Sequence, residues 1–187
     1  TDITSEKLDL LKLRNMARRD SLTGLFNQKT AKEIINDSLS RKPNSNFAIA
    51  VLDIDHFKQI NDIYGHITGN RILKQLAAKI QTNVRNNDMV SRFGGDEFII
   101  FLEYKTDVEA VIERIFRSIT GDYNGINISI SMGIATTEVC RRDGEELFSF
   151  ADKALYYVKR NGRGKFKFYD SSLANIFSDR IATDIES

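Results

Sequence analysis

Arg92-Phe93-Gly94-Gly95-Asp96-Glu97-Phe98 is the stretch from which the fold can be worked out. Two runs that have the pattern of strands, residues 89–93 and 98–102, flank it. The Gly-Gly pair between them predicts a hairpin, because glycine adopts the positive φ values that tight turns require. Two acids follow at once. Glycines let a phosphate approach the backbone, and adjacent carboxylates can hold a divalent cation on it, although a solvated surface hairpin would carry the same residues.

The composition is typical of globular proteins that fold in water. Its 187 residues suit one domain with appendages rather than two full domains. With 28% charged residues but a net charge of only +1, the chain has no overall attraction to nucleic acid or to a membrane surface. No apolar run approaches a membrane span, and no signal peptide is visible. The single cysteine, Cys140, excludes an internal disulfide and fits a reducing cytosol.

An N-terminal helix is expected over residues 3–19. Its apolar positions form a short stripe of the coiled-coil type, made of Ile3, Leu10, Leu13 and Ala17. A terminal helix packed on its own domain is the alternative. The start at Thr1 without a methionine leads us to expect a longer protein. Asp2-Ile3-Thr4 resembles the ending of PAS sensor domains, so a sensor of that kind is expected upstream.

A buried strand that ends in two carboxylates comes next in importance. Residues 47–52 form a continuous apolar run, which is typical of a strand covered on both faces. Asp53 and Asp55 follow, and side chains two residues apart on a strand share a face. Such a pair is costly unless it meets a metal, a base or water, which makes this a candidate site. Asp55 also has a plainer interpretation as a turn or helix-capping carboxylate.

The remaining pattern alternates helices with strands. Helices are expected over residues 28–40, from 69 to about 80, 106–119 and 145–160, strands over 126–135 and 166–169, and a turn-rich loop over 56–65. The segment from 170 is expected to be a tail, helical if it leads into more protein. This order favours an α+β sandwich with a mostly antiparallel sheet over a doubly wound fold.

Several separated motifs together resemble the GGDEF family, bacterial diguanylate cyclases that join two GTP molecules into cyclic di-GMP. The likeness runs from Asp20 to about Tyr169. It is carried by the signature with its preceding Arg92, Asp20-x-Leu22-Thr23-Gly24-Leu25-x-Asn27, Asp53-x-Asp55-x-Phe57-Lys58-x-x-Asn61-Asp62, Gly65-His66, and Ala151-Asp152-x-Ala154-Leu155-Tyr156 with Lys159 and Gly162-Arg163. Gln28 departs from the family's usual arginine. The family's palm-like fold, shared with nucleotidyl cyclases and polymerases, agrees with the α+β expectation.

The resemblance implies a role for each matching residue. Two Mg²⁺ or Mn²⁺ ions per active site would be bound by Asp53 and Glu97, helped by the Ile54 carbonyl and by Asp96, which would also help to take up a proton. The remaining substrate contacts would come from Gly94 and Gly95 in the hairpin, from Lys58, Lys159 and Arg163 on the β- and γ-phosphates, and from Asn61 and Asn70 on the base. Arg85-x-x-Asp88 matches the family's inhibitory site for its product.

Each role has a plain alternative. Lys159 and Arg163 alone would be ordinary solvated charges near a helix end. Arg85 and Asp88 alone would be a surface ion pair. Arg92 and Asp20 are expected to form a structural ion pair rather than to act in catalysis.

Asn70 is a second departure from the family pattern, in which an aspartate faces guanine. A carboxylate accepts from both guanine N–H groups, whereas an amide offers one acceptor and one donor. Asn70 would then relax the choice of purine, allowing some ATP use and a mixed GMP–AMP product. The alternative is that Asn70 only caps the helix that begins beside it.

The sequence therefore predicts a signalling helix over residues 1–19, a GGDEF catalytic domain over 20–170 and a tail or linker over 171–187. We expect a cytoplasmic bacterial diguanylate cyclase, or a membrane-tethered one in full-length form, that works as a homodimer with GTP as substrate and is inhibited by cyclic di-GMP. The competing classes are a cyclic di-GMP receptor, a GTP-sensing module and a dimerisation adaptor. None of these three needs two metals, so the set of acids and cations argues against them.

Overall fold

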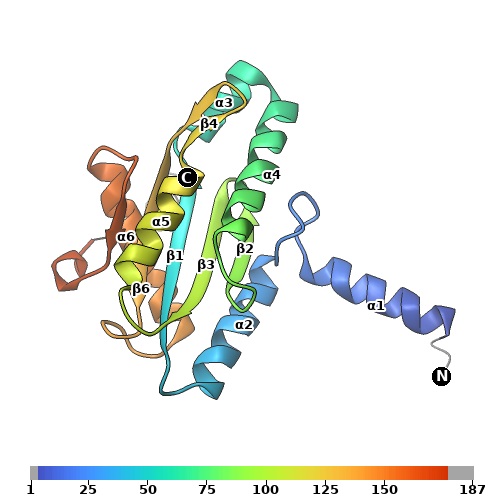
Figure 1. Cartoon of the computed structure of the whole chain (residues 1–187), viewed down its shortest axis with the longest axis horizontal. Helices are drawn as coiled ribbons and strands as arrows, with labels where there is room; N and C mark the ends of the chain where they lie inside the picture. Colours follow the sequence, from blue (N-terminus) through green and yellow to red (C-terminus); the bar gives the residue numbers. More distant parts are fainter. Residues whose placement is uncertain (1–3, 177–187) are drawn as a thin grey trace.

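A five-stranded sheet in the order β2-β3-β1-β6-β7 forms the centre of the computed structural model, which describes residues 4–176 (Figure 1). Its strands are β1 (Asn46–Ile54), β2 (Met89–Gly94), β3 (Glu97–Tyr104), β6 (Ile130–Thr136) and β7 (Phe166–Phe168). The central strand, β1, runs antiparallel to both β3 and β6, and only β7 joins in parallel. The expected α+β class with a mostly antiparallel sheet is confirmed.

Helices cover both faces of this sheet because its strands are apolar on both sides. Ala48, Ala50 and Leu52 of β1 pack in the cluster that includes residues of α4 (His66–Thr82) and α5 (Val108–Ile119). The intervening Phe47, Ile49 and Val51 pack in a second cluster with α2 (Gln28–Arg41) and α6 (Gly144–Arg160). The result is three layers with the sheet in the middle (Figure 1).

One glycine lets α6 lie close against the sheet. A Cβ added at Gly133 of β6 would stand 2.1 Å from the Ala151 carbonyl oxygen and 2.2 Å from the Leu155 nitrogen. Real Cβ atoms do not approach a backbone so closely, so any side chain at this position would push the helix away. Gly133 thus lets the middle of α6, at Ala151 and Leu155, lie directly on β6.

Three local expectations were wrong. The expected strand over 126–135 is broken at Ser129 into β5 (Ile126–Ile128) and β6, and β5 pairs with β4 (Gly121–Tyr123) in a separate two-stranded sheet. The expected loop over 56–65 contains a helix, α3 (Phe57–Tyr64). In the signature hairpin Gly94 pairs with Glu97, so the turn residues are Gly95 and Asp96 rather than the two glycines.

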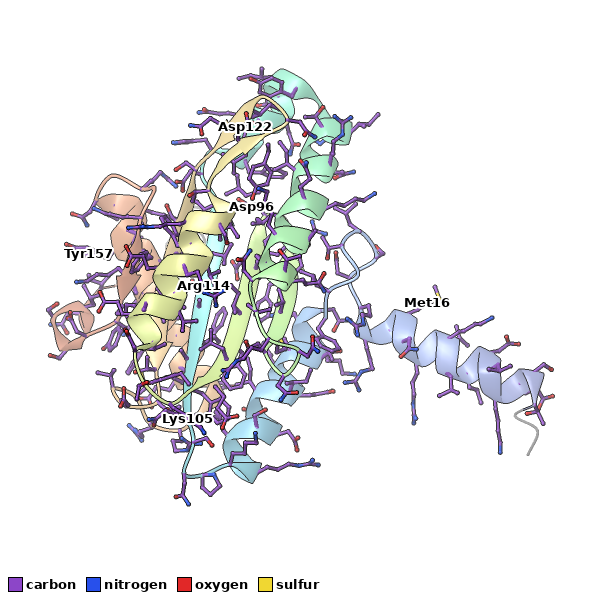
Figure 2. All side chains as sticks on the ribbon, viewed as in Figure 1. Met16, Asp96, Lys105, Arg114, Asp122 and Tyr157 are labelled. Carbon is purple, nitrogen blue, oxygen red and sulfur yellow. The ribbon has the colours of Figure 1, made fainter. Side chains whose placement is uncertain are left out.

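The N-terminal helix α1 (Ser5–Arg18) extends away from the sheet, and none of its residues is buried (Figure 1). Met16, labelled in Figure 2, is 73% exposed, and Leu10 and Leu13 are more than half exposed. The helix is therefore confirmed, but its packing against its own domain is not seen. Ile3 lies outside the described residues.

At the other end, a 3-10 turn over Ser171–Leu173 buries Leu173 against the second cluster. The rest of the predicted tail, from 177, lies outside the described residues. Among the helices of residues 4–176, none combines the length and the apolarity that crossing a membrane requires.

Candidate active site

The two acids predicted to bind metal lie opposite each other on neighbouring strands. Asp53, near the end of β1, is the register partner of Glu97, the first residue of β3. Directly opposed residues of an antiparallel pair point to the same face, with Cβ atoms about 5 Å apart. Val51 lies two residues before Asp53 and Ile99 two residues after Glu97, and both pack in the cluster that contains residues of α6. Side chains two apart on a strand share a face, so both carboxylates point toward α6.

Asp53 is a buried acid with an incomplete set of partners. Its side chain is 11% exposed and forms an ion pair with Lys159 from the last turn of α6 through Oδ2. Its other oxygen, Oδ1, is buried and accepts no hydrogen bond. Burial raises the pKa of Asp53 to about 7, the Lys159 charge lowers it, and the nearby charges of Asp96 and Asp55 raise it again. A second cation beside Oδ1 would remove this penalty.

Asp96 occupies the hairpin turn, as Figure 2 shows. Burial raises its pKa, and the charge of Lys159 acts in the opposite direction. Arg92 holds this turn by donating from Nε and Nη2 to the Gly95 carbonyl oxygen, at 2.9 and 2.6 Å. Its Nη1 donates to Asp20 at 3.0 Å, which confirms the predicted ion pair. Arg92 and Asp20 therefore shape the hairpin, and the Arg92 charge also acts to lower the pKa of Asp96.

Asp55 is neither a helix cap nor a ligand with a free oxygen. The residue that precedes α3 is His56, with φ 57° and no capping hydrogen bond, so the capping interpretation was wrong. Asp55 lies in the turn between β1 and α3, as the other half of that interpretation predicted. Both Asp55 oxygens accept hydrogen bonds, from Ser129 and Ser131 at 2.6 Å each. Arg163 lies next to it, with Nη1 3.9 Å from Oδ1.

The residues predicted to recognise the base lie on two neighbouring helices, Asn61 on α3 and Asn70 on α4. A Cβ at Gly69 would stand only 1.8 Å from Asn61 Oδ1, so the missing side chain makes the space that Asn61 occupies. Asn70 is exposed and lies within α4, which begins at His66. The interpretation of Asn70 as a helix cap was therefore wrong. Lys58 is exposed on α3.

Sequence reasoning did not find Gly69. Its signal was present, because a glycine inside a helix destabilises it and usually has a packing reason.

The predicted inhibitory residues lie at the far end of β2, about 17 Å from the hairpin at 3.3 Å per residue. The Asp88 carboxylate accepts from the Arg85 backbone at 2.8 Å, and the two side chains form an ion pair at 3.7 Å. Arg85 also donates to the Glu103 carbonyl oxygen, yet its side chain remains 72% exposed. Both line a pocket of about 330 Å³ to which α5 adds Arg114, a residue the sequence did not single out (Figure 2).

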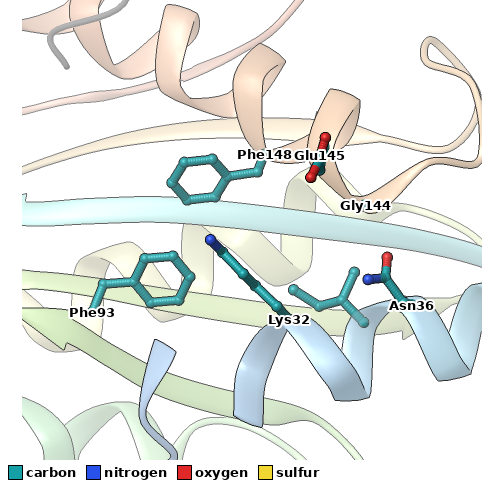
Figure 3. Close-up of a pocket in the computed structure, with 7 residues that line it drawn as sticks. Lys32, Asn36, Phe93, Gly144, Glu145 and Phe148 are labelled. Atoms are coloured by element: carbon teal, nitrogen blue, oxygen red, sulfur yellow. The ribbon is translucent and has the colours of Figure 1, made fainter. Parts of the chain in front are cut away.

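A different pocket, of about 210 Å³, lies between α2, the end of β2 and the start of α6 (Figure 3). Phe93 and Phe148 form one side of it, with ring centroids 5.3 Å apart and planes at 17°. Lys32 reaches toward the rings from α2. None of the predicted site residues lines this pocket, so the candidate active site is the more open region around Asp53.

The residues around Asp53 include the oxygen donors that a divalent cation requires. No three His, Cys, Asp or Glu side chains in residues 4–176 are grouped closely enough to hold a metal by themselves. Mg²⁺ does not need three, because it is usually bound by one or two carboxylates together with substrate phosphates and water. The unpaired Oδ1 of Asp53 and the facing Glu97 supply those two carboxylates.

Comparison with known proteins identifies the family of the chain. The family model described as "Diguanylate cyclase, GGDEF domain" matches residues 17–165, most of the chain. The chain belongs to the GGDEF family. The resemblance that the motifs indicated is therefore confirmed.

Relatives of this GGDEF chain carry two kinds of name. It is 37% identical over 164 residues to diguanylate cyclase DgcP of Pseudomonas aeruginosa, a match covering 82% of this chain and 24% of that protein. It is 31% identical to cyclic di-GMP phosphodiesterase PdeR of Escherichia coli, covering 89% of this chain and 26% of that protein. The chain thus spans about a quarter of the length of these relatives.

A solved structure has the same fold. The coiled coil and GGDEF domain of DgcB from Caulobacter crescentus, in complex with c-di-GMP, matches with a TM-score of 0.76 and 28% identity. The match covers 87% of this chain and 91% of that one.

Proposed function

We propose that this GGDEF domain is a diguanylate cyclase that condenses two GTP molecules into cyclic di-GMP and pyrophosphate. The observation that carries the proposal is the buried, unpaired Oδ1 of Asp53, which faces Glu97 across the sheet and adjoins Lys159. A receptor or an adaptor has no need of a buried acid without a partner, because such an oxygen costs stability. The kinship with DgcP supports the same choice.

Metal ions would complete this site. Asp53 and Glu97 would hold two Mg²⁺ or Mn²⁺ ions, with Asp96 and the Ile54 carbonyl as further oxygens. Bound there, the ions would neutralise triphosphate charge and lower the pKa of the attacking 3′ hydroxyl.

The residues of the chain do the positioning. Lys159 now pairs with Asp53, and a triphosphate at the site offers it a second set of oxygens. Lys58 and Arg163 supply the other two charges for the β- and γ-phosphates. Gly94 and Gly95 are exposed at the hairpin and leave room for the phosphate chain. Asn61, fixed against Gly69, faces the base together with Asn70.

Two domains must meet for the reaction, since each domain binds one GTP and the product joins two. The leucines of α1 are available for the pairing by a coiled coil, and the DgcB structure contains a coiled coil beside its GGDEF domain. We place the domain in the bacterial cytoplasm, with a PAS-like sensor upstream. Cyclic di-GMP would bind at Arg85 and Asp88 and slow the enzyme.

A second candidate is a non-catalytic module that binds cyclic di-GMP or GTP. Its support is the relative PdeR, which is named a phosphodiesterase although it matches this chain over 172 residues. The two candidates differ in one measurable property, the formation of a product.

Incubation with all four nucleoside triphosphates and Mg²⁺, followed by mass analysis of cyclic dinucleotides, tests the proposal. We expect cyclic di-GMP from the parent and none from Asp53→Asn or Glu97→Gln, since each change removes an anionic oxygen that a divalent cation needs. Asp122→Asn, an exposed aspartate of β4, is the matched control and keeps the parent rate. If the parent protein forms no product although it is a dimer, the result favours the non-catalytic binding module. Near-normal turnover in either active-site variant removes that residue from the metal site.

A further inference from the structure

Asp55 joins three segments of the chain that are distant in the sequence. Its Oδ2 accepts from Ser129 Oγ at 2.6 Å and from the Gly164 backbone nitrogen at 3.0 Å, and its Oδ1 accepts from Ser131 Oγ at 2.6 Å. Its own backbone nitrogen donates to the Ser129 carbonyl oxygen at 2.8 Å. The side chain is 2% exposed, so these contacts replace water completely.

The loop that Asp55 holds is strained. Gly162, Arg163 and Gly164 have φ values of 104°, 60° and 66°, three successive residues in the left-handed region. Arg163 is the member for which this conformation is unfavourable, because it has a Cβ. One end of the loop is fixed to α6, where the Arg163 nitrogen donates to the Val158 carbonyl oxygen at 2.9 Å. The Gly164 nitrogen fixes the other end by donating to Asp55 Oδ2 at 3.0 Å and to Ser131 Oγ at 3.1 Å, and Ser131 is itself held by Asp55.

Two acid–cation pairs therefore join the end of β1 to the end of α6, Asp53 with Lys159 and Asp55 with Arg163. They differ in one respect. Asp53 keeps an unpaired oxygen, whereas both oxygens of Asp55 accept hydrogen bonds. The Arg163 side chain is 38% exposed, and its Nη1 lies 3.9 Å from Asp55 Oδ1. Asp55 therefore orients the guanidinium, which can still contact a ligand.

We propose that Asp55 is a positioning residue for the triphosphate, which holds the loop 162–164 in its left-handed conformation so that Arg163 faces the phosphates. This rests on the proposed function for the role of Arg163. It gives the second acid of the Asp53-Ile54-Asp55 sequence a task distinct from metal binding. Ser129 and Ser131 support Asp55, and the break of the strand at Ser129 brings that hydroxyl to it.

The first experiment needs no ligand and compares the parent with Asp55→Asn by amide hydrogen exchange. The neutral amide of asparagine has one acceptor where the carboxylate of Asp55 has two charged ones, so the bond from the Gly164 N–H is lost or weakened. We expect that amide to exchange about tenfold faster or more, the effect of losing one hydrogen bond to a charged group. Asp122→Asn is the matched control, because Asp122 likewise accepts from a glycine nitrogen, that of Gly125 at 3.0 Å. Unchanged exchange at Gly164 overturns the proposal. If circular dichroism shows that Asp55→Asn does not fold, Ser129→Ala takes its place, because it removes a hydroxyl that orients Asp55 and leaves both acceptors of the Gly164 nitrogen present.

The second experiment measures binding of 3′-deoxy-GTP, which cannot react, and of GMP, which lacks the β- and γ-phosphates. Asp55→Asn should weaken 3′-deoxy-GTP binding about tenfold or more and leave GMP binding unchanged. In the Arg163→Ala background it should have no further effect, because the two changes remove the same contact. Equal losses for both nucleotides, or additive losses in the double variant, overturn the proposal. A parent that binds no 3′-deoxy-GTP contradicts the proposed function, while the exchange experiment still decides whether Asp55 holds the loop.

Discussion

The Asp53 carboxylate shows how one residue can be unfavourable for the fold and useful for the site. Burial raises its pKa from 3.8 to about 7, although Lys159 lies beside it. Between pH 3.8 and about 7 the folded chain thus keeps on Asp53 a proton that the unfolded chain has lost. Stability from this group is complete below the unfolded pKa, and it is lost as the pH rises through about 7.

Raising the pH from about 6 to about 8 should therefore lower the Tm of the metal-free protein more than that of Asp53→Asn. Addition of Mg²⁺, which needs the charged carboxylate, should raise the Tm of the parent more at the higher pH. Thermal unfolding followed by circular dichroism measures both effects, and Asp122→Asn again serves as the control. Identical pH profiles for the parent and Asp53→Asn would show that another group titrates in this range.

Asn70 leads to a second prediction about a single residue, which concerns the choice of purine. It lies inside α4 rather than at its start, so a capping role no longer explains it. With the amide facing the base, guanine loses one charge-assisted hydrogen bond of roughly 1.5–3 kcal/mol, or about 10- to 150-fold in affinity. In competition between equal GTP and ATP we expect some mixed GMP–AMP product from the parent and only cyclic di-GMP from Asn70→Asp. The same single product from both proteins at similar GTP affinity would assign base selection to Asn61 and the backbone.

At the scale of elements, the strands and long helices could be predicted and the junctions could not. The run over residues 47–52 and the periodic helices have patterns that local physics fixes, because one strand is buried on two faces and each helix on one. At the break, the Ser129 hydroxyl donates a hydrogen bond to Asp55, which is 74 residues away in the sequence. Nothing in the alternation of residues 126–135 signals such a contact.

The candidate site also has a part that could be predicted from the sequence and a part that could not. The acids and cations could be named because they match a motif, and Asp53 opposite Glu97 follows once β1 and β3 pair. The space at Gly69, the pocket contribution of Arg114 and the loop held by Asp55 depend on packing between distant segments. These are properties of the assembled sheet and helices, so they lie beyond sequence reasoning.

Strand β2 connects the two candidate sites, with the hairpin at one end and Asp88 just before the other. Arg85 is held by the Glu103 carbonyl oxygen on β3, so a ligand there contacts the same strand pair that carries Glu97.

We expect Arg85→Ala to weaken cyclic di-GMP binding by about tenfold or more, the effect of one lost charged contact, and to relieve inhibition at an unchanged initial rate. Calorimetry and progress curves measure these effects. The control is Lys105→Ala, which changes another cation of the same pocket without altering the Arg-x-x-Asp motif. Parent-like affinity in Arg85→Ala would place the inhibitory site elsewhere.

At the scale of the whole molecule, the arrangement of α1 relative to the sheet becomes the controlling feature. The helix buries none of its residues, and Leu10 and Leu13 are 64% and 61% exposed. Exposed leucines on one helical stripe lower their free energy by pairing with a second copy, each gaining about 1.5–3 kcal/mol when fully buried. A reaction that joins two bound nucleotides then depends on this pairing, while nucleotide binding to one domain does not.

Changing Leu10 and Leu13 together to aspartate should therefore convert a dimer into a monomer and make product formation fall steeply on dilution. Binding of 3′-deoxy-GTP to each chain should remain as in the parent, because α1 contributes no residue to the site. Lys12→Asp is the matched control, since it introduces the same acid on the same helix outside the stripe. Analytical ultracentrifugation and the dependence of the rate on protein concentration measure the two properties. If the double variant stays dimeric and active, the domains meet through another surface, and α1 transmits a signal without holding the pair together.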